Sequence, residues 1–69
     1  MKAVIVTGAY KSIRLGEVLE VSMIDTSSVM FKDKARAYAP AVCVCVDDEG
    51  NRLNMREAIQ LFRKERKNG

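Results

Sequence analysis

A single amphipathic helix, preceded only by segments with strand character, constrains the fold of this chain more than any other feature. Its apolar face has Leu61 at the margin and combines four side chains at helical spacing: Met55, Ala58, Ile59 and Phe62. Asn54 as N-cap and Glu57 three residues later approximate a capping box, which marks the start of the helix. We therefore predict a helix over about residues 55–67.

The chain before this helix carries the signals of four β-strands, at residues 2–7, 17–24, 28–32 and 41–46. The first is a β-branched run, and the second alternates, with Leu19, Val21 and Met23 on one face. The third places Val29 and Phe31 on one face and pairs with the second as a hairpin. The fourth is apolar on both faces, so we expect it to be covered on both sides.

Polar turns separate these segments. Residues 32–36 are expected to form an exposed turn or a charged edge, and residues 47–51 an acidic turn in which Gly50 supplies a positive φ. Strands followed by one helix predict a mostly-β α+β fold. We expect a small curled sheet or barrel of four or five antiparallel strands, with the C-terminal α-helix packed on an opening.

Length and composition indicate a single folded domain. Its 69 residues make a single domain, residues 1–69, and 48% hydrophobic residues suit a folded chain. No apolar run approaches the ~20 residues of a membrane span, and no leader pattern is present, so we expect no membrane partner and a cytoplasmic protein.

The two cysteines, Cys43 and Cys45, alternate on one predicted strand, so their side chains share a face. Neighbours of that kind have unsuitable geometry for a disulfide, and we expect both to be reduced and buried. The sequence has no histidine, and the acidic turn lacks the spacing of a calcium loop. We therefore predict no metal, no cofactor and, without an activated nucleophile or paired carboxylates, no enzymatic activity.

Charge is distributed unevenly along the chain. Residues 1–53 contain seven basic and seven acidic side chains, so the whole +3 excess lies in residues 54–69. A basic helix end attracts phosphate or an acidic protein surface. It also complements the helix dipole and keeps a small protein soluble, which is the structural alternative.

The segment Gly8-Ala9-Tyr10-Lys11, followed by Gly16-Glu17-Val18, resembles a KOW motif. The resemblance covers about a third of the chain, and it departs from the motif at Ser12 and in a longer span to Gly16. It implies an SH3-like barrel, a fold found in transcription elongation factors and ribosomal proteins. A fainter resemblance to the carbon storage regulator rests on Leu15-Gly16-Glu17 and the position of the helix.

The same segment also resembles the opening of a short-chain dehydrogenase, with Gly8 in place but Ser12 and Arg14 where the cofactor turn needs glycine. The chain is too short for a dinucleotide-binding domain, and the next segment alternates like a strand. We therefore expect no dinucleotide partner.

The first functional hypothesis is a non-catalytic module that binds nucleic acid or a nucleoprotein or transcription complex. In it the exposed loop at residues 10–14 supplies an aromatic ring for stacking and two cations for phosphate, and the helix end adds four more. The alternative is that Tyr10 covers the core and the cations are only solvated. The expected contact residues are Tyr10, Lys11, Arg14, Arg63, Lys64, Arg66 and Lys67. The second hypothesis is a phage or accessory protein that docks on a host protein through an edge strand at residues 29–32.

Overall fold

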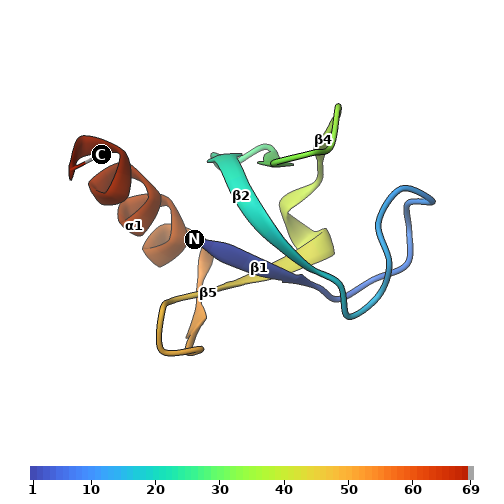
Figure 1. Ribbon diagram of the computed structural model, residues 1–69, viewed down its shortest axis with the longest axis horizontal. Coiled ribbons are helices and arrows are strands. Elements are labelled where there is room, and N and C mark those ends of the chain that lie inside the picture. The colour runs from blue at the N-terminus through green and yellow to red at the C-terminus, as the bar shows by residue number, and fades with distance from the viewer. Residues whose placement is uncertain (69) are drawn as a thin grey trace.

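The computed structural model describes residues 1–68 and shows one antiparallel sheet followed by one helix (Figure 1). Within these residues six strands lie in the order β4-β3-β2-β1-β5-β6. They are β1 (Lys2–Ile5), β2 (Val18–Ile24), β3 (Val29–Phe31), β4 (Ala37–Tyr38), β5 (Cys43–Val46) and β6 (Arg52–Leu53). A short 3₁₀ helix, η1 (Pro40–Val42), leads into β5, and helix α1 (Met55–Asn68) follows β6. The predicted mostly-β fold with a C-terminal helix is confirmed, as a curled open sheet that does not close into a barrel.

Two hairpin turns are held by aspartate side chains. The Asp25 carboxylate accepts hydrogen bonds from the backbone N–H groups of Ser27 and Ser28, at 2.8 and 2.9 Å, between β2 and β3. Between β5 and β6, Asp47 accepts from the backbone N–H groups of Glu49 and Asn51. Gly50 has φ +83° there, so the acidic turn predicted from the sequence is confirmed.

Strand β2 contains a β-bulge that changes which side chains face the core. The register with β3 shifts between Val21 and Met23, so that Ile24 is buried and Met23 is 41% exposed. The predicted grouping of Met23 with Val21 on one face is therefore wrong. A bulge inserts one extra residue, and every side chain after it changes face.

The core lies between the concave face of the sheet and α1. It contains twelve buried side chains: Ala3, Ile5, Ile13, Val21, Ile24, Val29, Phe31, Tyr38, Val42, Cys45, Ala58 and Phe62. The helix supplies Ala58 and Phe62 and packs against β2, β5 and β6. Its predicted face is confirmed at those two residues and at Ile59, which is half-buried against the core, whereas Met55 at the start of the helix is exposed.

The helix is fixed at both ends by polar contacts. The predicted capping box forms: the Glu57 N–H donates to Asn54 Oδ1 at 2.8 Å, and the Asn54 N–H donates to Glu57 Oε1 at 3.0 Å. Further along α1, Glu65 accepts from the Met1 amino group at 3.2 Å, and Glu20 on β2 accepts from the same group at 2.7 Å. This hydrogen bond from the amino group holds the pKa of Glu20 below its ordinary value. No helix within residues 1–68 is long and apolar enough to cross a bilayer.

Four details of the predicted strands are wrong. The segment 41–46 begins as a strand only at Cys43, because Pro40–Val42 form η1, and the first strand ends at Ile5 instead of residue 7. The two-residue strands β4 and β6 bring the number of strands to six. The segment 29–32 is not an edge, because β3 is paired with β2 on one side and β4 on the other.

Strand β5 is covered on one face only, which also differs from the expectation. Cys45 points into the core and is buried. On the opposite face, Val44 and Val46 are half-buried. They line an open hollow together with Val4 of β1 and with Val6, which directly follows β1. The uninterrupted apolar run at 41–46 therefore reflects a second apolar surface of the sheet.

Candidate functional site

The loop between β1 and β2 extends at the end of the molecule opposite α1 (Figure 1). It is anchored from inside by Ile13, which is only 2% exposed and belongs to the core. The Ser12 hydroxyl and the Tyr38 hydroxyl share a hydrogen bond of 2.6 Å, which ties the loop to β4. The expectation that the whole segment 10–14 is exposed is therefore wrong at Ile13, which fastens the loop to the core.

Tyr10 lies at the surface of this loop, half-buried against Tyr38. The two rings meet edge to face, with centroids 4.9 Å apart and planes at 89°. The guanidinium carbon of Arg36 lies 4.7 Å from the Tyr10 ring centroid and 5.4 Å from that of Tyr38. Tyr10 is thus neither a free side chain nor a core residue, because its ring is oriented by one aromatic and one cationic neighbour.

Arg36 was not among the residues predicted from the sequence. The sequence does contain a signal that Arg36 lies beside Tyr38. The two residues are two positions apart, on either side of Ala37, the first residue of β4. Side chains two apart in an extended segment point to the same face. That signal requires β4 to be recognised as a strand, and a two-residue strand leaves little pattern.

Three more cations belong to this loop or bind it, and they differ in how they are held. Lys34 donates to the backbone carbonyl of Ser12 at 2.9 Å and lies 4.0 Å from Glu17, so it fastens the loop. Lys11 and Arg14 have exposed side chains. We define the loop cluster as Tyr10, Lys11 and Arg14 of the loop, together with Arg36, whose guanidinium lies over the Tyr10 ring.

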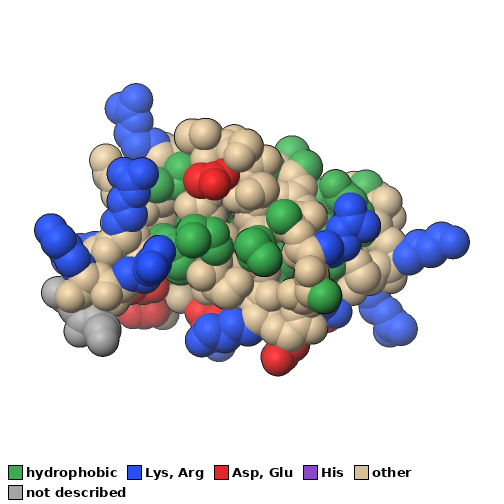
Figure 2. Space-filling view, turned by 90° about the horizontal axis from the view of Figure 1, so that it is seen from above, with side chains coloured by type: hydrophobic (Ala, Val, Ile, Leu, Met, Phe, Trp, Pro, Cys, Tyr) green, Lys and Arg blue, Asp and Glu red, His purple; other side chains and the backbone are tan. Residues whose placement is uncertain are grey.

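The other predicted contact residues lie on α1. We define the helix cluster as Arg63, Lys64, Arg66 and Lys67, which are exposed and line a shallow hollow of about 590 Å³. The Arg66 guanidinium also lies over the Phe62 ring, with its carbon 5.7 Å from the ring centroid. Figure 2 shows Lys and Arg side chains gathered at both ends of the long axis, with hydrophobic surface between them. Because that axis is 33 Å long, the predicted residues form two separate sites and not one patch.

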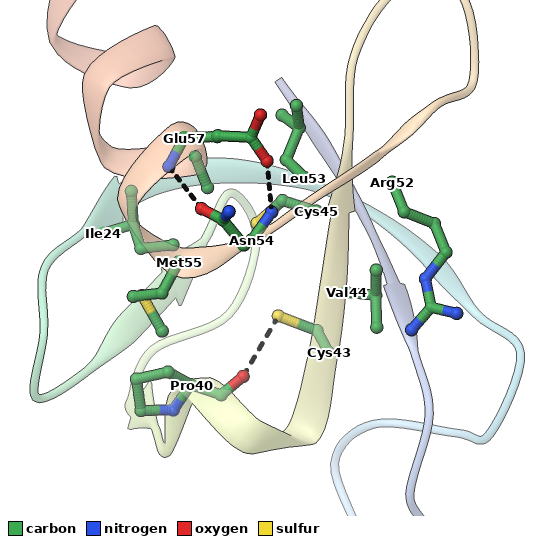
Figure 3. Close-up of a pocket in the computed structure, with 11 residues that line it drawn as sticks. Ile24, Pro40, Cys43, Val44, Cys45, Arg52, Leu53, Asn54, Met55 and Glu57 are labelled. Carbon is green, nitrogen blue, oxygen red and sulfur yellow. Dashed lines mark hydrogen bonds between the residues drawn. The ribbon is translucent and has the colours of Figure 1, made fainter.

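A groove of about 380 Å³ lies between β5, β6 and the start of α1 (Figure 3). It is lined by Pro40, Cys43 and Met55 among other residues, and the Cys43 thiol points toward the Pro40 carbonyl at 3.8 Å. Both cysteines are free thiols, with Cys45 buried and Cys43 half-buried, which differs from the expected burial of both. Hydrogen bonding to Cys45, together with burial, raises the pKa of Cys43, so this thiol keeps its proton at neutral pH. Within residues 1–68 no group of three or more His, Cys, Asp or Glu side chains is arranged to hold a metal ion.

No family model matches this chain, and comparison with curated proteins and with solved structures found no significant match. The KOW resemblance of the segment from Gly8 to Val18 therefore stays a prediction.

Proposed function

We propose that this protein is a non-catalytic module that binds nucleic acid, alone or within a nucleoprotein complex, through the loop cluster. The observation that carries the proposal is the Tyr10 ring, oriented by Tyr38 and Arg36 in a loop that also carries the exposed cations Lys11 and Arg14. Stacking of a base on an aromatic ring contributes about 1–3 kcal/mol and is tolerant of sequence. Lysine and arginine beside such a ring supply the phosphate contacts that position the chain.

Local charge supports the same surface. The segments 10–17 and 33–36 together contain Lys11, Arg14, Lys34 and Arg36 against two carboxylates, Glu17 and Asp33. Glu17 is itself occupied, because it accepts the Arg14 N–H at 2.9 Å and faces Lys34. The two segments together therefore carry a net positive charge, although residues 1–53 as a whole are neutral.

The helix cluster is a second, purely electrostatic contact in this proposal. The molecule is 33 Å long, and B-form DNA rises about 3.4 Å per base pair, so a ligand that reaches both clusters spans about 10 base pairs or more. Short ligands bind the loop cluster, where stacking adds to charge, and do not reach the helix cluster. Binding therefore depends on ligand length as well as on charge.

Fluorescence anisotropy with labelled single strands and duplexes tests the proposal at ~20 mM salt, where phosphate contacts are strongest. A loop variant carries Tyr10→Leu, Lys11→Ala and Arg14→Ala, and a helix variant carries alanine at Arg63, Lys64, Arg66 and Lys67. Arg56→Ala is the matched control, because Arg56 is an exposed cation of α1 outside both clusters. We expect the loop variant to weaken binding to ligands of every length, the helix variant to weaken binding to long ligands only, and the control to change neither.

The outcome that contradicts the proposal is the absence of binding to any nucleic acid at this salt concentration. An equal loss of affinity in the loop variant and in Arg56→Ala also contradicts the proposal, because affinity would then depend on the total charge of the protein and not on the loop cluster. In either case the cations only keep the domain soluble, and docking of a phage or accessory protein on a host protein becomes the first hypothesis.

A further inference from the structure

Three sulfur-bearing side chains line the groove between β5, β6 and the start of α1. They are Cys43 and Cys45 on β5 and Met55, the first residue of α1. Both cysteine side chains leave β5 toward the side on which Met55 and Pro40 lie (Figure 3), because residues two apart on a strand share a face. The fold therefore brings a thioether from the helix to the same groove as two thiols from the sheet.

The two thiols lie side by side, and the groove gives access to both. A hydrogen bond joins the Cys43 and Cys45 side chains, and the Cys43 thiol also lies 3.8 Å from the Pro40 carbonyl oxygen. Cys45 is 5% exposed and Met55 is 37% exposed, so the sulfur donors extend from the floor of the groove to its rim. Because Cys45 still lines the groove, an ion that enters past Met55 reaches both thiols.

The surroundings of these three donors favour a soft ion. Two polar residues of the lining, Asn54 and Glu57, are joined to each other in the capping box. Hard ions such as calcium and magnesium need several oxygen ligands, and soft thiolate and thioether ligands suit other metals. Most of the remaining lining is apolar: Ile24, Pro40, Val44, Leu53 and Ala58.

The position of the groove also favours thiolate sulfur. It lies at the N-terminus of α1, where the helix dipole stabilises negative charge. The thiolate is the form of cysteine that binds a metal. The helix thus contributes to the groove in two ways, through the Met55 thioether and through the dipole of its first turn.

We propose that Cys43, Cys45 and Met55 bind one Cu(I) ion. Thiolate and thioether ligands together select Cu(I), whereas zinc sites take a closed tetrahedron of thiolate, imidazole and carboxylate ligands. On binding, Cu(I) displaces the proton of each cysteine thiol, and both protons pass to water. Two neutral thiols and one Cu(I) thereby become a complex with a single negative charge, and no electron is transferred.

This proposal differs from the prediction of no metal that the sequence supports. That prediction considers zinc and calcium, for which histidine or an interleaved carboxylate loop is the expected signal. The Met55 thioether is not part of such a signal, because only the packing of α1 against β5 and β6 brings it to the cysteines. The site therefore becomes visible in the fold and not in the sequence.

Competition for Cu(I) with the chelator bathocuproine, without oxygen and with ascorbate present, tests the proposal on the full chain without nucleic acid. We expect the chain to hold one equivalent of Cu(I). Its thermal midpoint should rise on binding, because the ion binds the folded chain better than the unfolded one. Cys43→Ser should weaken binding at least about 100-fold and Met55→Leu at least about tenfold, since each removes a direct ligand.

Met23→Leu is the matched control for Met55→Leu, because Met23 is a similarly exposed methionine that lies on β2, outside the groove. Thermal midpoints of the metal-free proteins check that each variant is folded. Both Cys43 and Met55 are at least partly exposed, so their substitution leaves the core in place.

Several results overturn the proposal. One is a chain that loses all Cu(I) to the chelator, and another is Cu(I) binding that Cys43→Ser leaves unchanged. A third is an equal loss of affinity in Met23→Leu and Met55→Leu. A thermal midpoint that Cu(I) does not raise would show that the fold adds nothing to the cysteines, and an equal rise with Zn²⁺ would contradict the choice of metal. These residues belong to neither the loop cluster nor the helix cluster, so this failure is distinct from failure of nucleic-acid binding.

Discussion

The hydroxyl groups of Ser12 and Tyr38 lie 2.6 Å apart and join the loop between β1 and β2 to strand β4. Tyr38 is one of the most buried side chains of the domain, and its ring also supports Tyr10. One residue of a two-residue strand therefore connects the core with the candidate binding surface.

Removal of that hydroxyl by Tyr38→Phe is expected to lower the free energy of unfolding by about 1 kcal/mol, the net value of one partly buried hydrogen bond. Ser12→Ala removes the same bond from the other side. In urea unfolding the double variant should lose little more than either single variant, because both substitutions break one interaction. Strictly additive losses would contradict a direct bond between the two side chains.

Phe62→Ala is expected to lower the free energy of unfolding by about 3–5 kcal/mol, because it leaves a cavity between α1 and the sheet. This is a large share of the stability of so small a domain. Phe62 is 7% exposed, whereas its neighbour Arg63 is exposed, so Arg63→Ala serves as a control that should change stability by less than about 0.5 kcal/mol. A thermal midpoint that hardly moves in Phe62→Ala would mean that α1 does not contribute to the core.

Asn54→Ala removes the side-chain acceptor for the Glu57 N–H and is expected to cost about 1 kcal/mol of stability. Glu57→Ala removes the reciprocal bond to the Asn54 N–H. Arg56 lies between them and takes no part in the box, so Arg56→Ala provides the comparison. Circular dichroism during urea unfolding measures all three, and equal midpoints would show that the cap is not a determinant of helix stability.

Acid should weaken the domain partly through Asp25. Hydrogen bonds from Ser27, and then from the Ser28 backbone, hold the pKa of Asp25 below its ordinary value of 3.8. A carboxylate with a lowered pKa in the folded state stabilises the fold above the pKa of the unfolded chain, and this contribution is lost as pH falls through the folded value. Asp25→Asn cannot titrate, so its thermal midpoint should fall less than that of the unchanged protein between about pH 5 and pH 2. Parallel pH profiles for the two proteins would rule out this role.

The salt dependence of binding distinguishes stacking from phosphate contact within the loop cluster. The slope of log affinity against log salt is about −0.7 per phosphate contact on single strands and −0.9 on duplex. Replacement of Lys11 and Arg14 by alanine should reduce its magnitude by one to two such units. Tyr10→Leu should lower the affinity with little change in slope, because stacking releases no counterions. If the salt slope decreases more in Tyr10→Leu than in the variant without Lys11 and Arg14, the assignment of stacking to Tyr10 and of phosphate contact to the two cations is wrong.

Local signals predicted the parts of this fold that depend on neighbours in the chain. Asn54 and Glu57 form their capping box, and Asp47 closes its turn, because each interaction spans only a few residues. The bulge beside Met23 was missed, since it depends on how β2 pairs with β3 and leaves no mark in the alternation of β2 itself.

The candidate site was predicted in its residue types and not in its arrangement. Tyr10 and Lys11 were found from the loop pattern, whereas Arg36 joins them only through the pairing of β4 with β3. The distribution of charge along the sequence placed the excess of positive charge on the helix. It did not predict the distance between the helix and the loop. The separation of the helix cluster from the loop cluster therefore emerges only from the three-dimensional arrangement, in which the loop and α1 lie at opposite ends of the molecule (Figure 1).

The central position of β1 has a consequence for how this domain folds. In the sheet, Ala3 pairs with Leu19 on one side and with Cys45 on the other. The β2–β3 hairpin forms from adjacent residues, but the β1–β5 ladder must close a loop that contains most of the chain, and long loops close at a higher entropic cost. Sheets that depend on such non-local pairing fold more slowly than helical bundles of equal size. The first strand therefore stays without one of its two partners until β5 has been synthesised, and α1, which follows β5 in the chain, is the last element to add side chains to the core.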